Sequence, residues 1–158
     1  MLLKNLIKNI PANINNIEIS NLASDSRKVK KGCLFFALQG SKLDGNNFIT
    51  QAVKKGAKAI VCSRKIKTIQ KKIPIIRVEN TRESLGYACS KFFDKKPENI
   101  IAVTGTNGKS SVAEFFYQIL EKNNYSVASI GTLGIKFKNK LKSTNLTSLD
   151  VISLHKEL

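Results

Sequence analysis

The chain has 158 residues, enough for one domain of usual size and part of a second. Its composition, with 42% hydrophobic and 24% charged residues, is that of a globular protein and excludes a disordered or fibrous chain. The formal net charge is +16, and all but four of the 27 basic residues are lysines. Because these lysines are spread along the chain, we interpret them as solvated surfaces that favour anionic small substrates, with a nucleic-acid-binding surface as the alternative.

The first part of the chain predicts strands that alternate with helices. An amphipathic helix is expected within residues 1–10, where the apolar positions have helical spacing and the intervening lysines exclude a signal peptide. Dense apolar runs predict buried strands at residues 33–38 and 57–62, joined by a helix that ends at Gly56. Residues 73–78 predict a further strand, and Pro74 either places it at a sheet edge or marks its start.

A helix and a polar linker then predict a domain boundary. Residues 81–93 have helical periodicity, and Asn80 is suited to cap the helix. The residues that follow the helix are polar and include a proline, as in many linkers. We therefore expect one domain over residues 1–97 and a second that begins at residue 98 and continues to residue 158.

The second domain predicts a βαβ unit. Residues 100–103 predict a buried parallel strand, residues 109–122 a helix with an apolar face, and residues 125–130 the next strand. From residue 131 onward the pattern is less regular, until a helix begins near residue 148. Such a unit leaves a small sheet with an uncovered edge, so we expect a truncated chain.

The spacing of the cysteines and the hydropathy of the chain indicate the cellular compartment in which the protein is expected. Three cysteines lie far apart without a CxxC pair, which argues against a disulfide framework or a zinc site and favours a reducing cytoplasm. No apolar run approaches the roughly 20 residues that a membrane span needs. We therefore expect a cytoplasmic protein without a membrane partner.

The strongest chemical signal is TGTNGKSS at residues 104–111, between a predicted strand and a predicted helix. Glycines let backbone N–H groups face a phosphate chain, and the helix N-terminus adds positive potential. A lysine reaches the outer phosphates, and the hydroxyl after it can hold Mg²⁺. The match to the general phosphate-loop pattern is incomplete, because Val103 stands at its first glycine. The alternative, a tight turn with a capping serine, explains Ser110 but not the pair Gly108 and Lys109.

This shortened loop resembles that of the Mur ligases and of the folylpolyglutamate synthases, which usually carry an extra glycine after the lysine. Residues 25–27 (DSR), 32–40 (GCLFFALQG) and 44–45 (DG) resemble the N-terminal UDP-binding domain of MurE- and MurF-type ligases, which the synthases lack. GTLG at 131–134 and LTSLD at 146–150 resemble the MurE type more than the MurF type. The resemblance covers essentially the whole chain, which corresponds to the first third of such an enzyme.

The resemblance implies an α/β fold: a small UDP-binding domain followed by the start of an ATP-binding central domain with a parallel sheet. It implies an ATP- and Mg²⁺-dependent ligase of peptidoglycan precursor synthesis. In that reaction the carboxylate of UDP-N-acetylmuramoyl-L-alanyl-D-glutamate becomes an acyl phosphate, and the amine of a third amino acid, diaminopimelate or lysine, displaces phosphate. A monomer without a nucleic-acid partner is expected. Because the amino-acid site of the family lies beyond Leu158, we expect no ligation by this chain alone.

The resemblance also implies the site residues. Lys109 is the implied catalytic residue at the outer phosphates, and Ser110, where the family usually has threonine, is the implied Mg²⁺ ligand. The residues implied to hold the ATP phosphates are Gly105, Thr106, Asn107, Gly108, Lys109, Ser110 and Ser111. Those implied to contact the UDP substrate are Ser24, Ser26, Ser41, Lys42, Leu43, Thr147 and Ser148. At Ser148 the chain departs from the family, because Ser-Leu replaces Thr-Pro.

Plainer interpretations stay open for several of these positions. Residues 25–27 can form an Asx turn with a surface arginine, and residues 41–45 a polar loop. Thr147 and Ser148 can cap the final helix, with Asp150 in its first turn. We assign His155, which has no partner at catalytic spacing, to the surface. At the level of function, a MurF-type fragment, a non-catalytic nucleotide-binding remnant and a basic nucleic-acid-binding protein remain alternatives.

Overall fold

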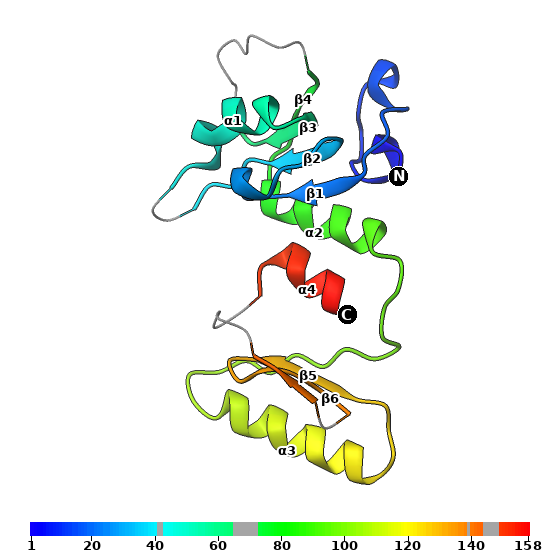
Figure 1. The fold of residues 1–158 in the computed structure, drawn as a ribbon, viewed down its shortest axis with the longest axis vertical. Coiled ribbons are helices and arrows are strands. Elements are labelled where there is room, and N and C mark those ends of the chain that lie inside the picture. The colour runs from blue at the N-terminus through cyan, green and yellow to red at the C-terminus, as the bar shows by residue number, and fades with distance from the viewer. Residues whose placement is uncertain (41–42, 65–72, 139, 144–148) are drawn as a thin grey trace. The chain divides into compact units, whose positions relative to one another are not determined.

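The structure is a computed structural model that describes residues 1–40, 43–64, 73–138, 140–143 and 149–158. The chain forms two compact units, residues 1–95 with 155–157 and residues 96–154 with 158 (Figure 1). Helices and strands occur in both units, and the first contains a parallel sheet. The α/β class that the sequence predicts is therefore confirmed.

A four-stranded parallel sheet forms the centre of the first unit. Its strands lie in chain order and are β1 (Asn21–Ala23), β2 (Cys33–Phe36), β3 (Ala57–Cys62) and β4 (Ile75–Arg77). The predicted strands β2 and β3 are confirmed at the middle of the sheet, and β4 is confirmed as an edge strand that begins directly after Pro74. The sequence does not predict β1, because three residues are too few to show alternation.

Two helices lie on opposite faces of this sheet, as Figure 1 shows. Helix α1 (Ile49–Lys54) is followed by Gly56, whose φ of +99° is the left-handed conformation expected after a helix end. Helix α2 (Thr81–Phe92) is capped by Asn80, whose side chain accepts hydrogen bonds from the backbone N–H groups of Arg82 at 3.0 Å and Glu83 at 3.2 Å. Both predicted helices and the predicted cap are therefore confirmed.

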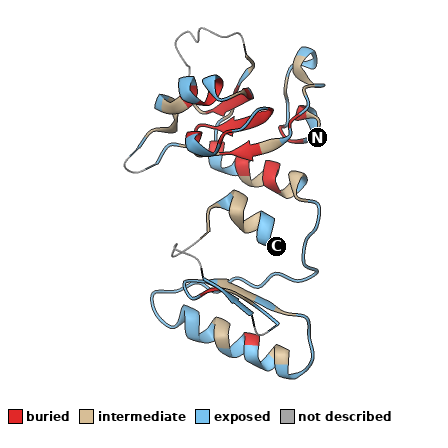
Figure 2. Ribbon diagram, viewed as in Figure 1, coloured by how far each residue is buried: buried red, intermediate tan, exposed pale blue. Residues whose placement is uncertain are grey.

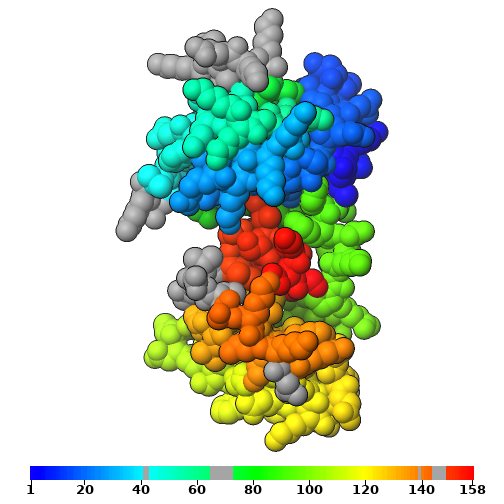
Figure 3. Space-filling model, viewed as in Figure 1, coloured from blue at the N-terminus to red at the C-terminus, as the bar shows by residue number. Residues whose placement is uncertain are grey.

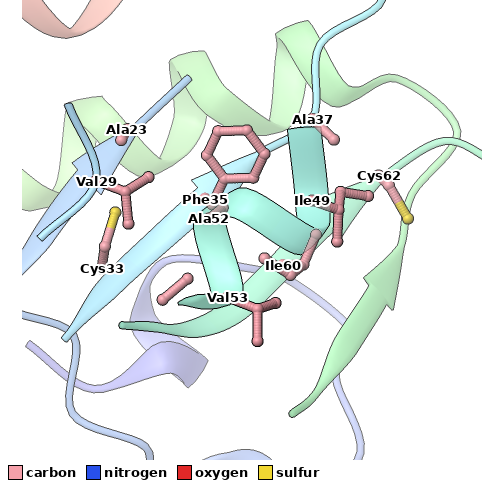
Figure 4. Packing of buried hydrophobic residues seen from close by; sticks show 11 residues of the cluster. Ala23, Val29, Cys33, Phe35, Ala37, Ile49, Ala52, Val53, Ile60 and Cys62 are labelled. Atoms are coloured by element: carbon pink, nitrogen blue, oxygen red, sulfur yellow. The ribbon is translucent and has the colours of Figure 1, made fainter. Parts of the chain in front are cut away.

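The core between α1 and the sheet is built from buried side chains such as Phe35, Ile49 and Ile60 (Figure 4). The register of β3 against β2 shifts by one residue, so that Lys58 is accommodated as an exposed extra residue. This shift allows Ala57 and Ile60, three positions apart, to face the same core, whereas regular alternation would place them on opposite faces.

The N-terminal prediction is only partly right. Residues Leu3–Asn5 form a single 3-10 turn, and the helix expected within residues 1–10 does not continue. Instead, the backbone N–H of Leu3 donates to the Ile17 carbonyl and that of Ile19 to the Met1 carbonyl, both at 2.8 Å. The backbone N–H and C=O groups of this segment therefore form hydrogen bonds with residues 17–19. The spacing of apolar residues within the segment does not reveal this pairing.

The second unit combines one long helix with a small antiparallel sheet. Helix α3 (Lys109–Lys122) has the bounds that the sequence predicts. The sheet has the order β5 (Ala128–Gly131), β6 (Gly134–Phe137) and β7 (Lys140–Lys142). The predicted βαβ unit is wrong in two respects: β5 pairs antiparallel with β6, and residues 100–103 form no strand. No described segment pairs with residues 100–103, and a strand exists only through such pairing.

The predicted apolar face of α3 is largely exposed (Figure 2). Its members Val112, Phe115, Phe116 and Ile119 have exposed fractions between 42% and 63%. Tyr117, on another side of the helix, is 1% exposed. Figure 3 shows the yellow side chains of α3 at the surface of this unit. The helix thus packs on its hairpin through its less apolar side.

A short helix, α4 (Val151–Glu157), follows near the end of the chain. Its cap is Asp150, whose carboxylate accepts from the backbone N–H of Ser153 at 3.0 Å and from its hydroxyl at 2.8 Å. The alternative interpretation, in which Thr147 or Ser148 caps this helix, is wrong because the cap is Asp150; Thr147 and Ser148 themselves lie outside the described residues. Among the helices that the structure describes, none is long and apolar enough to cross a membrane.

Candidate functional site

The loop before α3 contains two glycines with positive φ and leads into a helix without a capping side chain. Gly105 and Gly108 have φ values of +149° and +76°, which favour glycine, and Gly108 is the N-cap of α3. No side chain caps this helix. Its first N–H groups therefore face outward, without the capping side chain that helix N-termini usually carry. This is the local geometry that a phosphate group can complete.

The side chain of Lys109 lies over the same loop. Its ammonium group donates to the carbonyl of Gly105 and, at 3.0 Å, to the carbonyl of Thr106. The lysine is exposed, and both acceptors belong to the loop itself. A cation of this kind can exchange these carbonyls for phosphate oxygens, which are stronger acceptors because they are charged.

The GTLG segment at residues 131–134 contacts the loop at Ser110. The hydroxyl oxygen of Ser110 lies 3.1 Å from that of Thr132, which follows β5. Both residues line a hollow of about 290 Å³ between α3 and the hairpin. On the wall of this hollow, Lys136 forms an ion pair with Glu114 and lies 4.7 Å from the centre of the Tyr117 ring. The bond from Lys136 lowers the pKa of Glu114, and Glu114 raises the pKa of Lys136.

In the first unit, candidate residues gather at the carboxyl end of the parallel sheet, where open α/β sheets commonly bind ligands. Ser24 directly follows β1 and is half-buried. Ser26 is 5% exposed, and its hydroxyl donates to the side-chain oxygen of Gln51 at 2.7 Å. Ser26 therefore anchors this turn to α1, a contact that the sequence does not reveal.

The turn at residues 25–27 confirms the plainer interpretation of this motif. The carboxylate of Asp25 accepts from the backbone N–H of Arg27 at 2.9 Å, which makes an Asx turn. The guanidinium of Arg27, whose side chain is 83% exposed, also donates to both carboxylate oxygens. These bonds hold the pKa of Asp25 below its usual value.

The predicted loop after β2 is bounded by a small bridge between Gln39 and Asp44. Two arginines hold this bridge: Arg82 donates to the carbonyl of Gln39 and Arg64 to the carboxylate of Asp44, both at 3.2 Å. Of the three loop residues expected to contact substrate, Leu43 is 67% exposed. Ser41 and Lys42 lie outside the described residues, as do Thr147 and Ser148.

Sequence reasoning did not assign roles to Gln51, Arg64, Arg82 and Thr132. The first three contact residues that lie 20 or more positions away in the sequence. No pattern of neighbouring residues therefore indicates their roles. Thr132 lies in the GTLG segment, which the resemblance singled out without a role for it. His155, expected at the surface, is half-buried on α4. No three metal-binding side chains of the His, Cys, Asp or Glu type cluster within the described part of the chain.

Two family models match the two units. The model of the Mur ligase family catalytic domain matches residues 18–93, and that of the Mur ligase middle domain matches residues 103–158. The chain belongs to the Mur ligase family. The loop before α3 lies in the part that matches the middle domain, and the parallel sheet lies in the part that matches the other model.

Relatives within the Mur ligase family are MurE enzymes. The chain is 44% identical over 161 aligned residues to UDP-N-acetylmuramoyl-L-alanyl-D-glutamate–2,6-diaminopimelate ligase of Bradyrhizobium diazoefficiens, with 100% of the chain covered. It spans 33% of that relative's length. A solved structure of a ligase of the same name matches with a TM-score of 0.82 and 25% identity, covering 99% of this chain and 32% of that one.

MurF is a weaker match within the family. The MurF ligase of Thermotoga maritima, solved in complex with ADP, matches with a TM-score of 0.51 and 28% identity. That match covers 67% of this chain and 24% of the MurF chain. The expectation of a MurE-type rather than a MurF-type chain is therefore confirmed.

Proposed function

We propose that this chain supplies the UDP-substrate and ATP-phosphate sites of a MurE-type ligase. The reaction is the ATP-dependent addition of the third amino acid to UDP-N-acetylmuramoyl-L-alanyl-D-glutamate, by way of an acyl phosphate. The relatives' names support diaminopimelate over lysine. One observation carries the proposal: the uncapped N-terminus of α3, with Lys109 folded over its loop, in a chain that aligns throughout with MurE.

The residues of the loop fit a nucleotide polyphosphate with Mg²⁺. Outward N–H groups from residues 109–111 and the lysine supply donors and positive charge, while the Ser110 and Ser111 hydroxyls supply oxygen atoms. Gly105, Thr106, Asn107 and Gly108 form the turn around the phosphates. When bound, Mg²⁺ at Ser110 would neutralise phosphate charge.

Lys109 has the central part in the chemistry that we propose. Its ammonium group leaves the loop carbonyls and binds the outer phosphate oxygens, where negative charge must be neutralised as the phosphoryl group moves to the substrate carboxylate. The helix N-terminus orients the phosphate chain. Positioning and electrostatic stabilisation are the main contributions that a protein makes to this reaction.

For the UDP substrate we propose the carboxyl end of the parallel sheet in the first unit. Ser24 and Ser26 border this end, and the latter is fixed by Gln51. Ser41, Lys42 and Leu43 belong to the loop after β2, whose bounding residues are held by two arginines. For Thr147 and Ser148, which belong to the second part of the chain, we propose contact with the peptide portion of the substrate.

The proposed domains are residues 1–97 for UDP-substrate binding and residues 98–158 for the beginning of the ATP-binding domain. We propose that the protein acts in the cytoplasm, since its substrates are soluble nucleotides, and that it acts as a monomer. We propose that the amino-acid site lies in the part of a MurE ligase with which this chain does not align. The chain by itself is therefore expected to bind nucleotides without ligation.

The nucleotide site is tested by calorimetric titration of the chain with ADP and Mg²⁺. Lys109→Ala is expected to weaken ADP binding about tenfold or more, because charge-assisted bonds to phosphate are lost. Lys122→Ala, at the other end of the same helix, is the matched control and should bind ADP like the unaltered chain. Equal affinities for all three proteins would contradict the site.

The UDP site is tested in the same way with UDP as the probe. Ser24→Ala should weaken UDP binding and leave ADP binding unchanged, whereas Thr50→Ala, an exposed hydroxyl on α1, should change neither. For catalysis, residues 1–158 are joined to the remaining two thirds of the Bradyrhizobium relative. That chimera should ligate diaminopimelate, and Lys109→Ala should abolish its ATP-dependent turnover. Salt-sensitive DNA binding without any response to UDP would favour the nucleic-acid alternative instead.

A further inference from the structure

Thr132 is the one hydroxyl from outside the phosphate loop that the described structure brings into bonding distance of Ser110. The two residues are 22 positions apart, and their oxygen atoms are separated by 3.1 Å. Both side chains are exposed. A hydrogen bond between exposed hydroxyls contributes little to stability, because water replaces either partner. Stability therefore does not account for the pairing of these two motifs.

The turn that carries Thr132 has a defined geometry. Gly131 pairs with Gly134, so Thr132 and Leu133 form a two-residue connection between β5 and β6. Gly134 is buried with a φ of +111°, and a Cβ atom there would lie 2.5 Å from the carbonyl oxygen of Lys142. Only glycine satisfies this position. The hairpin thereby holds Thr132 beside the first turn of α3.

The chemistry of a metal-binding hydroxyl explains why such a neighbour is useful. An uncharged serine binds a cation through an oxygen lone pair, so its proton must point away from the cation. Thr132 Oγ1 is an acceptor at the right distance for that proton. The carboxylate of Glu114, which lines the same hollow, accepts instead from Lys136 and Gln118.

We propose that Thr132 is a positioning residue for Ser110: it accepts the Ser110 proton and thereby directs the serine oxygen toward Mg²⁺ bound with the nucleotide. This inference rests on the proposed nucleotide site. It assigns Thr132 no direct contact with phosphate. Thr132 acts through Ser110, and its effect depends on the presence of Mg²⁺.

The test measures the affinity of the chain for ADP with excess MgCl₂ and with EDTA. The unaltered chain should bind ADP more tightly with Mg²⁺. Thr132→Val keeps the shape but removes the acceptor. It should weaken ADP binding about tenfold when Mg²⁺ is present and leave ADP binding in EDTA unchanged. Thr132→Ser restores a hydroxyl and should restore the gain. Ser110→Ala should lose the gain, and adding Thr132→Val to it should cause no further loss.

Other results overturn the inference in distinguishable ways. If Thr132→Val keeps the Mg²⁺ gain while Ser110→Ala loses it, Thr132 has no positioning role and the nucleotide site stands. If Thr132→Val weakens binding equally with Mg²⁺ and with EDTA, its role is structural, which hydrogen exchange of the β5 and β6 amides would reveal independently. If the unaltered chain binds no ADP under either condition, both the inference and the proposed nucleotide site fail.

Discussion

The two units contain similar apolar patterns but bury them very differently. In the first unit, β2 and β3 lie between two helices, and side chains such as Phe35 and Phe36 are at most 1% exposed. In the second unit, the apolar stripe of α3 includes Phe115, which is 63% exposed. Amphipathic spacing therefore predicts that a helix forms and which residues share a face. Burial of that face requires a layer packed directly against it, and among the described residues the hairpin covers a different, less apolar side of α3.

The largest expected difference between the units comes from matched phenylalanine substitutions. Phe35→Ala should destabilise the first unit by about 3–5 kcal/mol, because it leaves a cavity in a closed core. Phe115→Ala should change the stability of the second unit by less than about 0.5 kcal/mol, because that ring already contacts water. Urea unfolding with hydrogen exchange of each unit measures both. Similar losses in the free energy of unfolding for the two variants would contradict the difference in burial between the two units.

The second unit should nevertheless be sensitive where its backbone is constrained. Gly134→Ala should cost about 1–3 kcal/mol, since it forces a side chain into a positive φ and against the Lys142 carbonyl. Gly131→Ala, in the same hairpin, meets no atom within 4 Å and is the control. Exchange rates of the β5 and β6 amides should rise in the first variant alone. Unchanged rates in both would mean that the hairpin does not need this glycine.

The two units also differ in how their longest helices are capped, since α2 has a side-chain cap and α3 has none. Asn80→Ala should cost about 1 kcal/mol, because the N–H groups of Arg82 and Glu83 lose their acceptor. Asn107→Ala, in the loop before α3, should cost much less, because no side chain caps that helix. Thermal unfolding of both variants measures the difference. A large loss for Asn107→Ala would indicate a capping role that conflicts with the open helix end we describe.

The smallest effect concerns thiol chemistry in the first core. Burial raises the pKa of Cys33 to about 12, so the neutral thiol is favoured in the folded state. Its contribution to stability is present below the ordinary thiol pKa of about 8.5 and is lost as pH rises from there toward about 12. At pH 8 Cys33 should react with a thiol reagent only after unfolding. Ser126→Cys, at an exposed position of the second unit, should react at once.

Local signals account for much of the fold. The bounds of α3, the cap at Asn80 and the edge position of β4 follow from periodicity, capping chemistry and proline geometry, all of which act within a few residues. The N-terminal segment was mispredicted because its backbone pairs with residues 17–19, and such pairing is decided by distant contacts. The antiparallel partner of β5 was missed for the same reason.

For the candidate site, the sequence by itself indicated the family and the loop at residues 104–111 that we propose as a phosphate site, because contact with a phosphate chain requires glycines, lysine and hydroxyls at fixed spacing. Only the tertiary structure decided that Ser26 is held by Gln51, that Arg64 and Arg82 hold the loop after β2, and that Thr132 meets Ser110. These contacts join residues between 20 and 43 positions apart. The spacing of residues along the chain determines which secondary structure a segment can form, whereas tertiary packing determines which other residues each side chain contacts.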